Sequence, residues 1–320
     1  MYMEEFTNKT NLYKAKTFGT TQINQASNRI ICIHCYCEMT LMVRLGKIAF
    51  ANCDFPYYAI EHGKLRTDDI DIIGAHPVEL ARMLREGELD ISPISSIMYA
   101  KQDDLLILPG LSITSNDFTK SVLICSNGQI KMSDFEGKTL CIPETTASSA
   151  ALVKIILRLK GVNVRIRQCN GTDIEKMLQQ GDAALLIGDS AIHAIGKYRV
   201  IADLGNEWKK LTGKKMVYAL WVVRGDFARK NPEKVKYVHD ILLKSKDFAY
   251  ENINEIAGNI GKQKNIDCDF MREYLHTLNY DFDKETIESL KLFFKYAREY
   301  GIIQDVNIRF FDNPDIGLSS

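Results

Sequence analysis

The segments D-A-A-L-L-I-G-D-S-A-I-H-A at residues 182–194 and D-L-G-N-E-W-K-K-L-T-G-K-K-M-V-Y-A-L-W-V-V-R at residues 203–224 decide the fold. In the first, the apolar run Ala183–Ile187 is followed at once by Gly188, Asp189 and Ser190. This order is typical of a buried strand that ends in a turn and leads into a helix. The start of such a helix commonly faces a ligand, so the segment predicts a binding cleft.

The composition indicates a globular protein without a strong overall charge. The chain has 320 residues, of which 46% are hydrophobic and 26% charged, which is enough for two lobes with cores of their own. Its 41 Lys and Arg residues balance 41 Asp and Glu residues, so no global positive field attracts nucleic acid or an anionic membrane. Any attraction for an anion must therefore be local.

Cysteine usage and hydropathy indicate a cytoplasmic protein. Eight cysteines in a chain of this length fall far below the density of a disulfide scaffold, which favours a reducing compartment. The most apolar early run, at residues 30–43, is interrupted by His34 and Glu38 and has no small-residue cleavage site. We therefore expect neither a secretory leader nor a membrane span.

The first 41 residues differ from the rest of the chain. They are rich in Asn, Thr and Lys without clear periodicity, and Met42 stands where a strand begins. We interpret residues 1–41 as an N-terminal extension that is disordered or not native. Their segment C-I-H-C-Y-C at residues 32–37 offers zinc ligands, but no second Cys or His pair follows at zinc-finger spacing, so we expect no metal site.

Short apolar runs alternate with amphipathic stretches from Val43 onward. The predicted strands are Val43–Phe50, Ile70–Gly74, Asp90–Ile94, Leu105–Ile113, Ser121–Ser126, Lys138–Ile142, Val162–Arg167, Ala183–Ile187 and Met216–Val223. The predicted helices between them are Tyr57–Glu61, Pro77–Arg85, Ser148–Leu159 and Thr172–Gln179. This alternation predicts an α/β protein with mostly parallel sheets, and the pattern changes to helices after residue 223.

The two successive strand sets predict two lobes. We expect residues 42–121 together with 216–320 to form the first lobe and its helical tail, and residues 122–215 to form the second. Crossover strands near Ser121 and Met216 would join them. A ligand would lie between the lobes, at the carboxyl ends of the strands.

Three polar segments fall where strands are expected to lead into helices. They are Ala51–Asp54, Ser95-Ser96 and Thr145–Ser149. Hydroxyls beside the free amides of a helix start suit a carboxylate or phosphate, although Ser and Thr also cap helices without binding anything. One hydroxyl-rich start in each lobe favours a ligand with two anionic groups.

Asp189 has two possible roles in the G-D-S turn. Its carboxylate can act as a base in the cleft or cap the helix that follows.

His193 lies one turn further on, where a histidine is more often packed or exposed than catalytic. Trp221 lies in an apolar strand and is expected in the core. The chain has no Gly-rich phosphate loop, paired zinc motif or Ser/His/Asp signature, so we expect no cofactor.

Six stretches give the chain a resemblance to a known family. They are G-K-I-A-F-A-N-C-D-F-P from Gly46, G-E-L-D-I-S-P-I-S-S-I-M-Y-A from Gly87, L-P-G-L-S-I-T-S from Leu108, S-V-L-I-C-S from Ser121, D-A-A-L-L-I-G-D-S-A from Asp182, and residues 203–224. Over about residues 43–224 the chain resembles the chorismate dehydratases of the futalosine route to menaquinone. The resemblance implies a two-lobe fold like that of type II periplasmic binding proteins, used for cytosolic chemistry.

The resemblance also implies a reaction and a site. Water is lost from chorismate, without metal or organic cofactor, to give 3-[(1-carboxyvinyl)oxy]benzoate. The residues assigned to the two carboxylates and the surrounding site are Ser95, Ser96, Ser121, Thr145, Thr146, Ser148, Ser149 and Gly188. Asn52 matches a family Asn that can orient or polarise the leaving hydroxyl. Since an amide is no base, the proton acceptor is a carboxylate, a histidine, water or the substrate's own carboxylate, and we rank Asp189 first.

The chain departs from the family pattern in two places. Asp117-Phe118-Thr119 stands where the family usually has Gly-Pro-Val, and Ala147 stands where an Arg is common. Thr145-Thr146-Ala147 also echoes the 1,4-dihydroxy-6-naphthoate synthase of the same route, which is the alternative enzyme, although the strand with Trp221 fits the dehydratases better. A second alternative is not an enzyme. It is a solute-binding protein that holds a small anion without converting it. The oligomeric state stays open.

Overall fold

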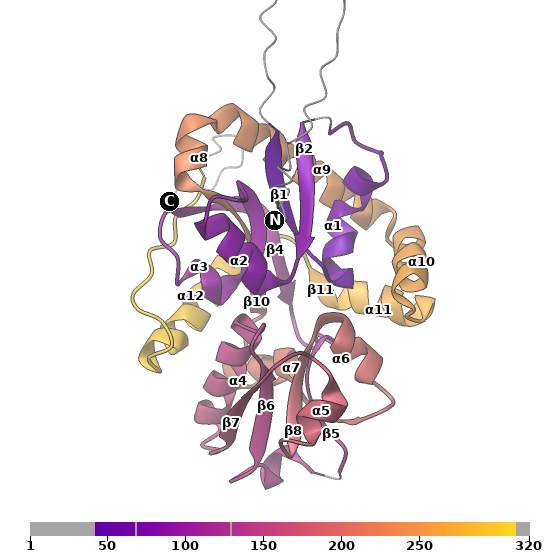
Figure 1. The fold of residues 1–320 in the computed structure, drawn as a ribbon, viewed down its shortest axis with the longest axis vertical. Coiled ribbons are helices and arrows are strands. Elements are labelled where there is room, and N and C mark those ends of the chain that lie inside the picture. Colours follow the sequence, from indigo (N-terminus) through magenta and orange to yellow (C-terminus); the bar gives the residue numbers. More distant parts are fainter. Residues whose placement is uncertain (1–41, 68, 129, 312–320) are drawn as a thin grey trace, which may run out of the picture. The chain divides into compact units, whose positions relative to one another are not determined.

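The computed structural model describes residues 42–67, 69–128 and 130–311, which form two β-sheets with helices packed on them (Figure 1). The extension predicted at residues 1–41, with its Cys and His segment, lies outside these residues. Within the described part of the chain, no helix has both the length and the apolar character needed to cross a bilayer.

The first sheet, sheet A, has the strand order β11-β4-β10-β3-β1-β2. Its strands are β1 (Val43–Ile48), β2 (Ile70–Ala75), β3 (Ile91–Ser95), β4 (Leu105–Ser115), β10 (Met216–Arg224) and β11 (Leu278–Asn279). Strand β1 runs parallel to β2 and β3, whereas β10 runs antiparallel to β3 and β4. The chain therefore leaves sheet A after β4 and returns to it at β10.

The second sheet, sheet B, has the strand order β7-β6-β8-β5-β9. Its strands are β5 (Val122–Ser126), β6 (Thr139–Pro143), β7 (Arg165–Cys169), β8 (Ala183–Ile187) and β9 (Arg199–Asp203). Strand β6 is parallel to β7 and β8, and β5 is antiparallel to β8 and β9. The strands of sheet A come from the residues expected in the first lobe, and those of sheet B from the residues expected in the second. That the two sets of residues form separate domains stays a prediction.

Most helices follow directly from a strand or form the C-terminal tail. They are α1 (Ala51–Glu61), α2 (Pro77–Arg85), α3 (Ser96–Tyr99), α4 (Ser148–Leu159), α5 (Ile174–Leu178), α6 (Gly188–Ala194), α7 (Leu204–Thr212), α8 (Gly225–Lys230), α9 (Pro232–Glu251), α10 (Ile253–Lys264), α11 (Cys268–Thr277) and α12 (Lys284–Glu299). In the tail, α9 packs against α1, and α12 packs against β10 and α4. The expected α/β architecture with C-terminal helices is confirmed.

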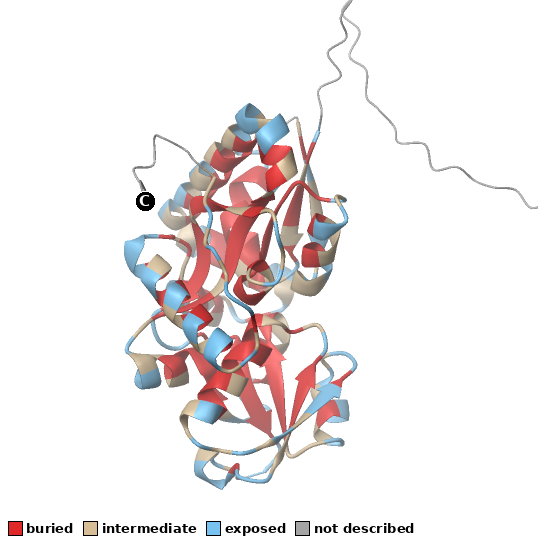
Figure 2. Cartoon of the chain, turned by 90° about the vertical axis from the view of Figure 1, so that its left-hand side faces the viewer, coloured by how far each residue is buried: buried red, intermediate tan, exposed pale blue. Residues whose placement is uncertain are grey.

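Both tryptophans belong to the core rather than to a cleft. Figure 2 shows buried residues running through the strands of both sheets, with exposed residues on the outer faces of the helices. Trp221 is fully buried, and its Nε1 donates to the Tyr57 hydroxyl at 3.0 Å, which in turn donates to the Gly46 carbonyl at 2.7 Å. Trp208 donates to the Lys215 carbonyl at 3.2 Å. Each indole N–H thus has a partner inside the protein.

Helix α1 begins six residues earlier than the sequence predicted. The predicted turn at residues 51–54 is in fact its first turn, and Pro56 lies inside the helix. A proline has no N–H for the carbonyl four residues before it, which here belongs to Asn52. That carbonyl instead accepts the Tyr280 hydroxyl at 2.7 Å, so the missing helical bond is replaced and Asn52 is held in place.

Residues 199–212, for which no element was predicted, form β9 and α7 around one buried carboxylate. Asp203 ends β9 and caps α7 by accepting the N–H groups of Gly205 at 2.9 Å and Asn206 at 3.3 Å. It also accepts the N–H groups of Thr119, at 3.0 and 3.1 Å to its two oxygens, and of Lys120 at 2.7 Å. Asp203 therefore fixes the crossover from sheet A to sheet B.

We expect the substitution Asp203→Ala to lower the free energy of unfolding by about 2–3 kcal/mol, because it leaves buried amide donors without an acceptor. Urea unfolding followed by circular dichroism measures this loss. The matched control is Asp173→Ala, which removes the cap of the exposed helix α5 and should cost about 1 kcal/mol. Equal losses for the two variants would contradict a special role for Asp203.

Candidate functional site

A cavity lies between the two sheets. It lies where strands of both sheets end and their helices begin. The lining residues are Ile48, Phe50, Asn52, Pro77, Ser95, Ile113, Thr119, Ser121, Val122, Thr145, Thr146, Ala147, Ser148, Ser149, Ile187, Gly188, Tyr218, Ala219 and Leu278. Eight residues assigned to the site from the sequence line it, and two, Ser96 and Asp189, do not.

Three polar atoms on the cavity wall have no hydrogen-bond partner in the protein. They are Ser95 Oγ, Thr146 Oγ1 and Asn52 Oδ1. The Ser95 and Thr146 side chains are 7% and 8% exposed. Because a buried polar atom without a partner costs free energy, these atoms are suited to bind a polar ligand.

The helices that start at the cavity lack side-chain caps of their own. The N-cap residues of α1, α3, α4 and α6 make no side-chain cap bond, although Ser95 is one of them. Elsewhere in the chain, aspartates cap α5, α7, α11 and α12. The hydroxyls at residues 145–149 therefore do not cap their own helix, and the free amides of α4, a helix of 12 residues, favour an anion at its start.

Two of the assigned serines join the sheets to each other. Ser96 is fully buried, and its Oγ lies 3.0 Å from Ser148 Oγ and donates to the Val217 carbonyl at 2.7 Å. Ser148 Oγ also accepts the Ile97 N–H at 3.0 Å. Ser96 thus does not reach the cavity, because its hydroxyl connects α3 to α4.

The remaining assigned residues lie on the cavity in two groups. Ser149 is buried and Thr145 half-buried at the start of α4. Ser121 Oγ lies 3.1 Å from Thr119 Oγ1 at the crossover between the sheets. The hydroxyls of both sheets therefore meet at one cavity.

Gly188 is required where α6 approaches Phe50. Its φ of +57° lies in the left-handed region, and a Cβ at this position would lie 2.7 Å from the Phe50 ring. Its N–H donates to the Ser121 carbonyl at 2.8 Å. A side chain is thus excluded both by backbone strain and by the wall of the cavity.

Asp189, ranked first as the base, lies outside the cavity lining, and its base role stays a prediction. Its Oδ1 accepts the N–H of Ala51, the first residue of α1, at 2.9 Å, and its Oδ2 lies 3.4 Å from Lys264 Nζ. Both oxygens are engaged, and the residue does not line the cavity. The alternative role, a cap on its own helix, is wrong, since Asp189 instead caps α1 from the other sheet.

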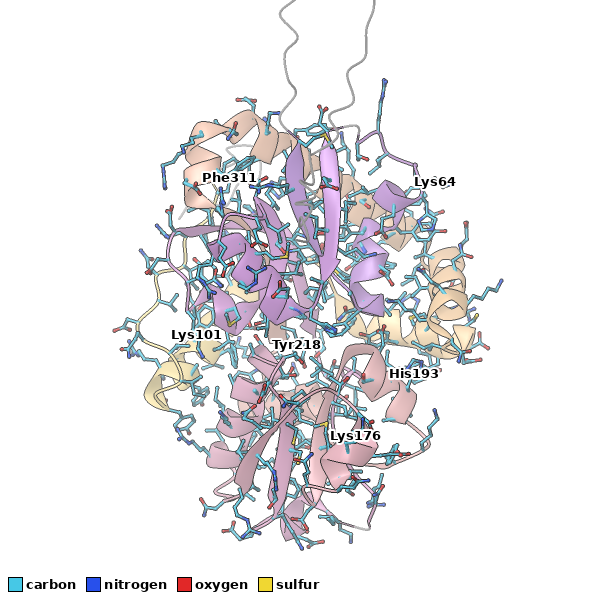
Figure 3. All side chains as sticks on the ribbon, in the orientation of Figure 1. Lys64, Lys101, Lys176, His193, Tyr218 and Phe311 are labelled. Carbon is cyan, nitrogen blue, oxygen red and sulfur yellow. The ribbon has the colours of Figure 1, made fainter. Side chains whose placement is uncertain are left out.

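Sequence reasoning missed Tyr218 and Thr119. Figure 3 places Tyr218 between the sheets, and its hydroxyl lies 3.3 Å from Ser115 Oγ. Burial raises the pKa of Tyr218, and the charge of Asp203 adds to this rise, so the phenol stays protonated. Tyr218 interrupts the apolar run of β10 with a hydroxyl, which could have indicated a polar group facing the site.

The cavity wall carries no formal charge. Among the described residues that line it there is no Asp, Glu, His, Lys or Arg. Across residues 42–67, 69–128 and 130–311, no three His, Cys, Asp or Glu side chains are grouped so that they could hold a metal ion. The arrangement can bind an anion through hydroxyls, an amide and helix starts, without a cationic side chain.

Comparison with known proteins decides the family. A family model described as "Menaquinone biosynthesis" matches residues 43–299. The chain belongs to this menaquinone biosynthesis family. A relative named chorismate dehydratase, from Thermus thermophilus, is 28% identical over 251 residues, which cover 72% of this chain and 88% of the relative.

Solved structures show the fold of this menaquinone biosynthesis family member. A protein of Archaeoglobus fulgidus superposes with a TM-score of 0.67 at 21% identity, covering 82% of this chain and 98% of that one. The alkanesulfonate-binding protein of Xanthomonas axonopodis, bound to MOPS, gives 0.64 at 15% identity, covering 82% and 94%. The chain has the two-sheet fold of periplasmic binding proteins, as the sequence predicted.

Proposed function

We propose that the protein removes water from chorismate to give 3-[(1-carboxyvinyl)oxy]benzoate. Membership of the menaquinone biosynthesis family and the 28% identical relative named chorismate dehydratase support this activity. The observation that carries it is the uncharged cavity with two unpartnered hydroxyls, Ser95 Oγ and Thr146 Oγ1, at helix starts of the two sheets. Two carboxylates separated by a ring need such anion-binding positions on opposite walls.

The helix starts on the two walls suit the two carboxylates. Thr146 Oγ1 and the free amides of α4 form one position in sheet B, and Ser95 Oγ forms another in sheet A. The ring between them would contact apolar side chains such as Ile48, Phe50 and Leu278. A rigid dicarboxylate would thereby be held with its C4 hydroxyl toward Asn52.

Asn52 is suited to assist the departure of the C4 hydroxyl. An amide N–H donates a hydrogen bond to the leaving oxygen, and the bond strengthens as negative charge develops there. Two hydrogen bonds fix the backbone at Asn52. The Tyr280 hydroxyl donates to the Asn52 carbonyl, and the N–H of the preceding Ala51 donates to Asp189. The backbone that carries this amide is therefore held in place before a substrate binds.

The proton acceptor in this proposal is the enolpyruvyl carboxylate of the substrate. The described cavity wall carries no carboxylate or imidazole, and Tyr218 is kept protonated. This carboxylate can reach the proton on C3 through a six-membered ring. The ring consists of C3, the ether oxygen, the vinyl carbon, the carboxyl carbon, one carboxylate oxygen and the proton itself. The C3–H electrons enter the ring π system toward the carboxylate on C1, the C4–O bond breaks, and the proton and hydroxide leave as water.

The direct experiment is to incubate the purified protein with chorismate and analyse the products by mass spectrometry. We expect a product lighter than chorismate by one water, with the chromatographic behaviour of 3-[(1-carboxyvinyl)oxy]benzoate. Folded protein that binds a small anion tightly but forms no such product would contradict the proposal and favour a solute-binding module.

The substitution Asn52→Ala should lower kcat by about 100-fold or more, because it removes a hydrogen bond that strengthens in the transition state. Its effect on KM should be small. The matched control is Asn163→Ala, since Asn163 is an exposed asparagine that contacts Glu136. Steady-state kinetics on both variants test this, and an Asn52→Ala enzyme with unchanged kcat would remove Asn52 from the reaction.

The pH dependence of kcat distinguishes the substrate carboxylate from a protein base. Carboxylates titrate near pH 4, and burial raises the pKa of Tyr218, so no group in the proposed site titrates near neutrality. We expect kcat to be constant between about pH 6 and 9. A profile that rises with an apparent pKa between about 6 and 8 would show a histidine or a perturbed protein carboxylate acting as the base.

A further inference from the structure

Asp189 replaces the cap that helix α1 lacks. The N-cap position of α1 is Phe50, which has no acceptor in its side chain. The Ala51 N–H instead donates to Asp189 Oδ1 at 2.9 Å, although the two residues are 138 positions apart. A carboxylate at a helix start stabilises the free amides and the positive end of the helix dipole.

Lys264 connects this cap to the C-terminal tail. Its Nζ, at the end of α10, lies 3.4 Å from Asp189 Oδ2 and 3.4 Å from Asp54 Oδ2 in α1. On the other side of Asp54, Lys47 Nζ lies 2.5 Å from Oδ1 and 2.7 Å from Glu61. Helices α6, α1 and α10 are thus joined by alternating charges.

A second bond joins α6 to the same helix of the tail. The His193 Nε2, on α6, lies 3.2 Å from the Lys264 carbonyl. The charged and titratable groups at this contact are therefore Asp189, His193 and Lys264, with Asp54 next to them. We name the contact of Asp189 with Ala51 and Lys264 the clasp.

The clasp lies directly beside the cavity. Asn52 follows Ala51 and Gly188 precedes Asp189, and both line the cavity wall. The Gly188 backbone is packed so closely on Phe50 that no Cβ fits between them. This part of the wall therefore exists only while α6 stays against the start of α1.

Another polar contact between the sheets lies near the cavity, on a different pair of helices. It is the Ser96, Ser148 and Ile97 contact between α3 and α4. Figure 1 shows α3 and α4 on one side of the molecule and α1 and α6 on the other. The two contacts therefore fasten the two sides of the site separately.

We propose that Asp189 is a positioning residue, which closes α6 over the cavity, holds Asn52 in place and takes no proton from the substrate. Lys264 is its counter-ion. The kinetic part of this inference rests on the proposed dehydration, whereas the closure itself does not. Since an asparagine can still accept the Ala51 N–H but cannot act as a base, Asp189→Asn separates positioning from proton transfer.

Amide hydrogen exchange at Ala51, resolved by mass spectrometry with fragmentation, measures the clasp without any ligand. We expect exchange to accelerate at least 10-fold in Asp189→Ala and to stay within about 3-fold of the parent protein in Asp189→Asn. The control Asp173→Ala removes a cap at α5 and should leave Ala51 exchange unchanged. An Asp189→Ala protein with the exchange rate of the parent would overturn the proposal.

Kinetics on chorismate test the second half of the inference. We expect kcat/KM to fall at least 10-fold in Asp189→Ala, mostly through kcat because Asn52 is no longer held in place, and to change by less than about 5-fold in Asp189→Asn and in Lys264→Gln. Loss of kcat in Asp189→Asn as complete as in Asp189→Ala would identify Asp189 as the base and overturn the inference.

Two further outcomes are distinguishable. If Asp189→Ala fails to fold, Asp189→Asn still decides between a positioning role and a base, and Lys264→Gln tests the ion pair. If the parent protein forms no product from chorismate, the proposed function fails, while Ala51 exchange continues to test the clasp.

Discussion

One carboxylate joins the two sheets at the point where a ligand would lie. Asp189 accepts the first amide of α1 and pairs with Lys264, so sheet B, sheet A and the tail meet at a single side chain. The helix starts around the cavity depend on such contacts, because the sheets are otherwise connected near it by the crossover and a few polar bonds. Asp203 has the corresponding role at the crossover, where it accepts amides from both segments.

The described cavity wall carries no formal charge, so an anion in the site would be bound by hydrogen bonds and not by an ion pair. An ammonium or guanidinium would bind any carboxylate strongly, including the ground state of the substrate, and would raise affinity more than turnover. Hydroxyls and helix amides bind an anion through directional hydrogen bonds. They therefore discriminate by the position of the anionic group as well as by its charge. Asp189 and Lys264 are instead paired with each other in the clasp, where Asp189 directly follows Gly188 of the wall.

The sequence was sufficient for features that depend on local pattern. The apolar run before Gly188, the alternation from Val43 and the hydroxyls at residues 145–149 are local, and each was placed correctly on a strand or helix start. The start of α1 was placed six residues too late, at Tyr57. Only the fold brings Tyr280, 224 residues further on, to the carbonyl that Pro56 leaves free.

The side-chain partners within the site could not be read from the sequence. Ser95 and Ser96 are adjacent and alike, yet one lies on the cavity and the other bonds α4, because successive residues at a strand end point in different directions. Asp189 could be recognised as functional from its turn, but its partner Ala51 has no distinguishing side chain and donates through its backbone. Such a contact leaves no sequence pattern.

A crystal structure with bound 3-[(1-carboxyvinyl)oxy]benzoate tests the account most directly. We expect the ring in the cavity between the sheets, one carboxylate at Thr146 and the start of α4, the other near Ser95, and Asp189 still bonded to Ala51. A carboxylate paired with Lys264, or Asp189 turned into the cavity toward the ring, would contradict it.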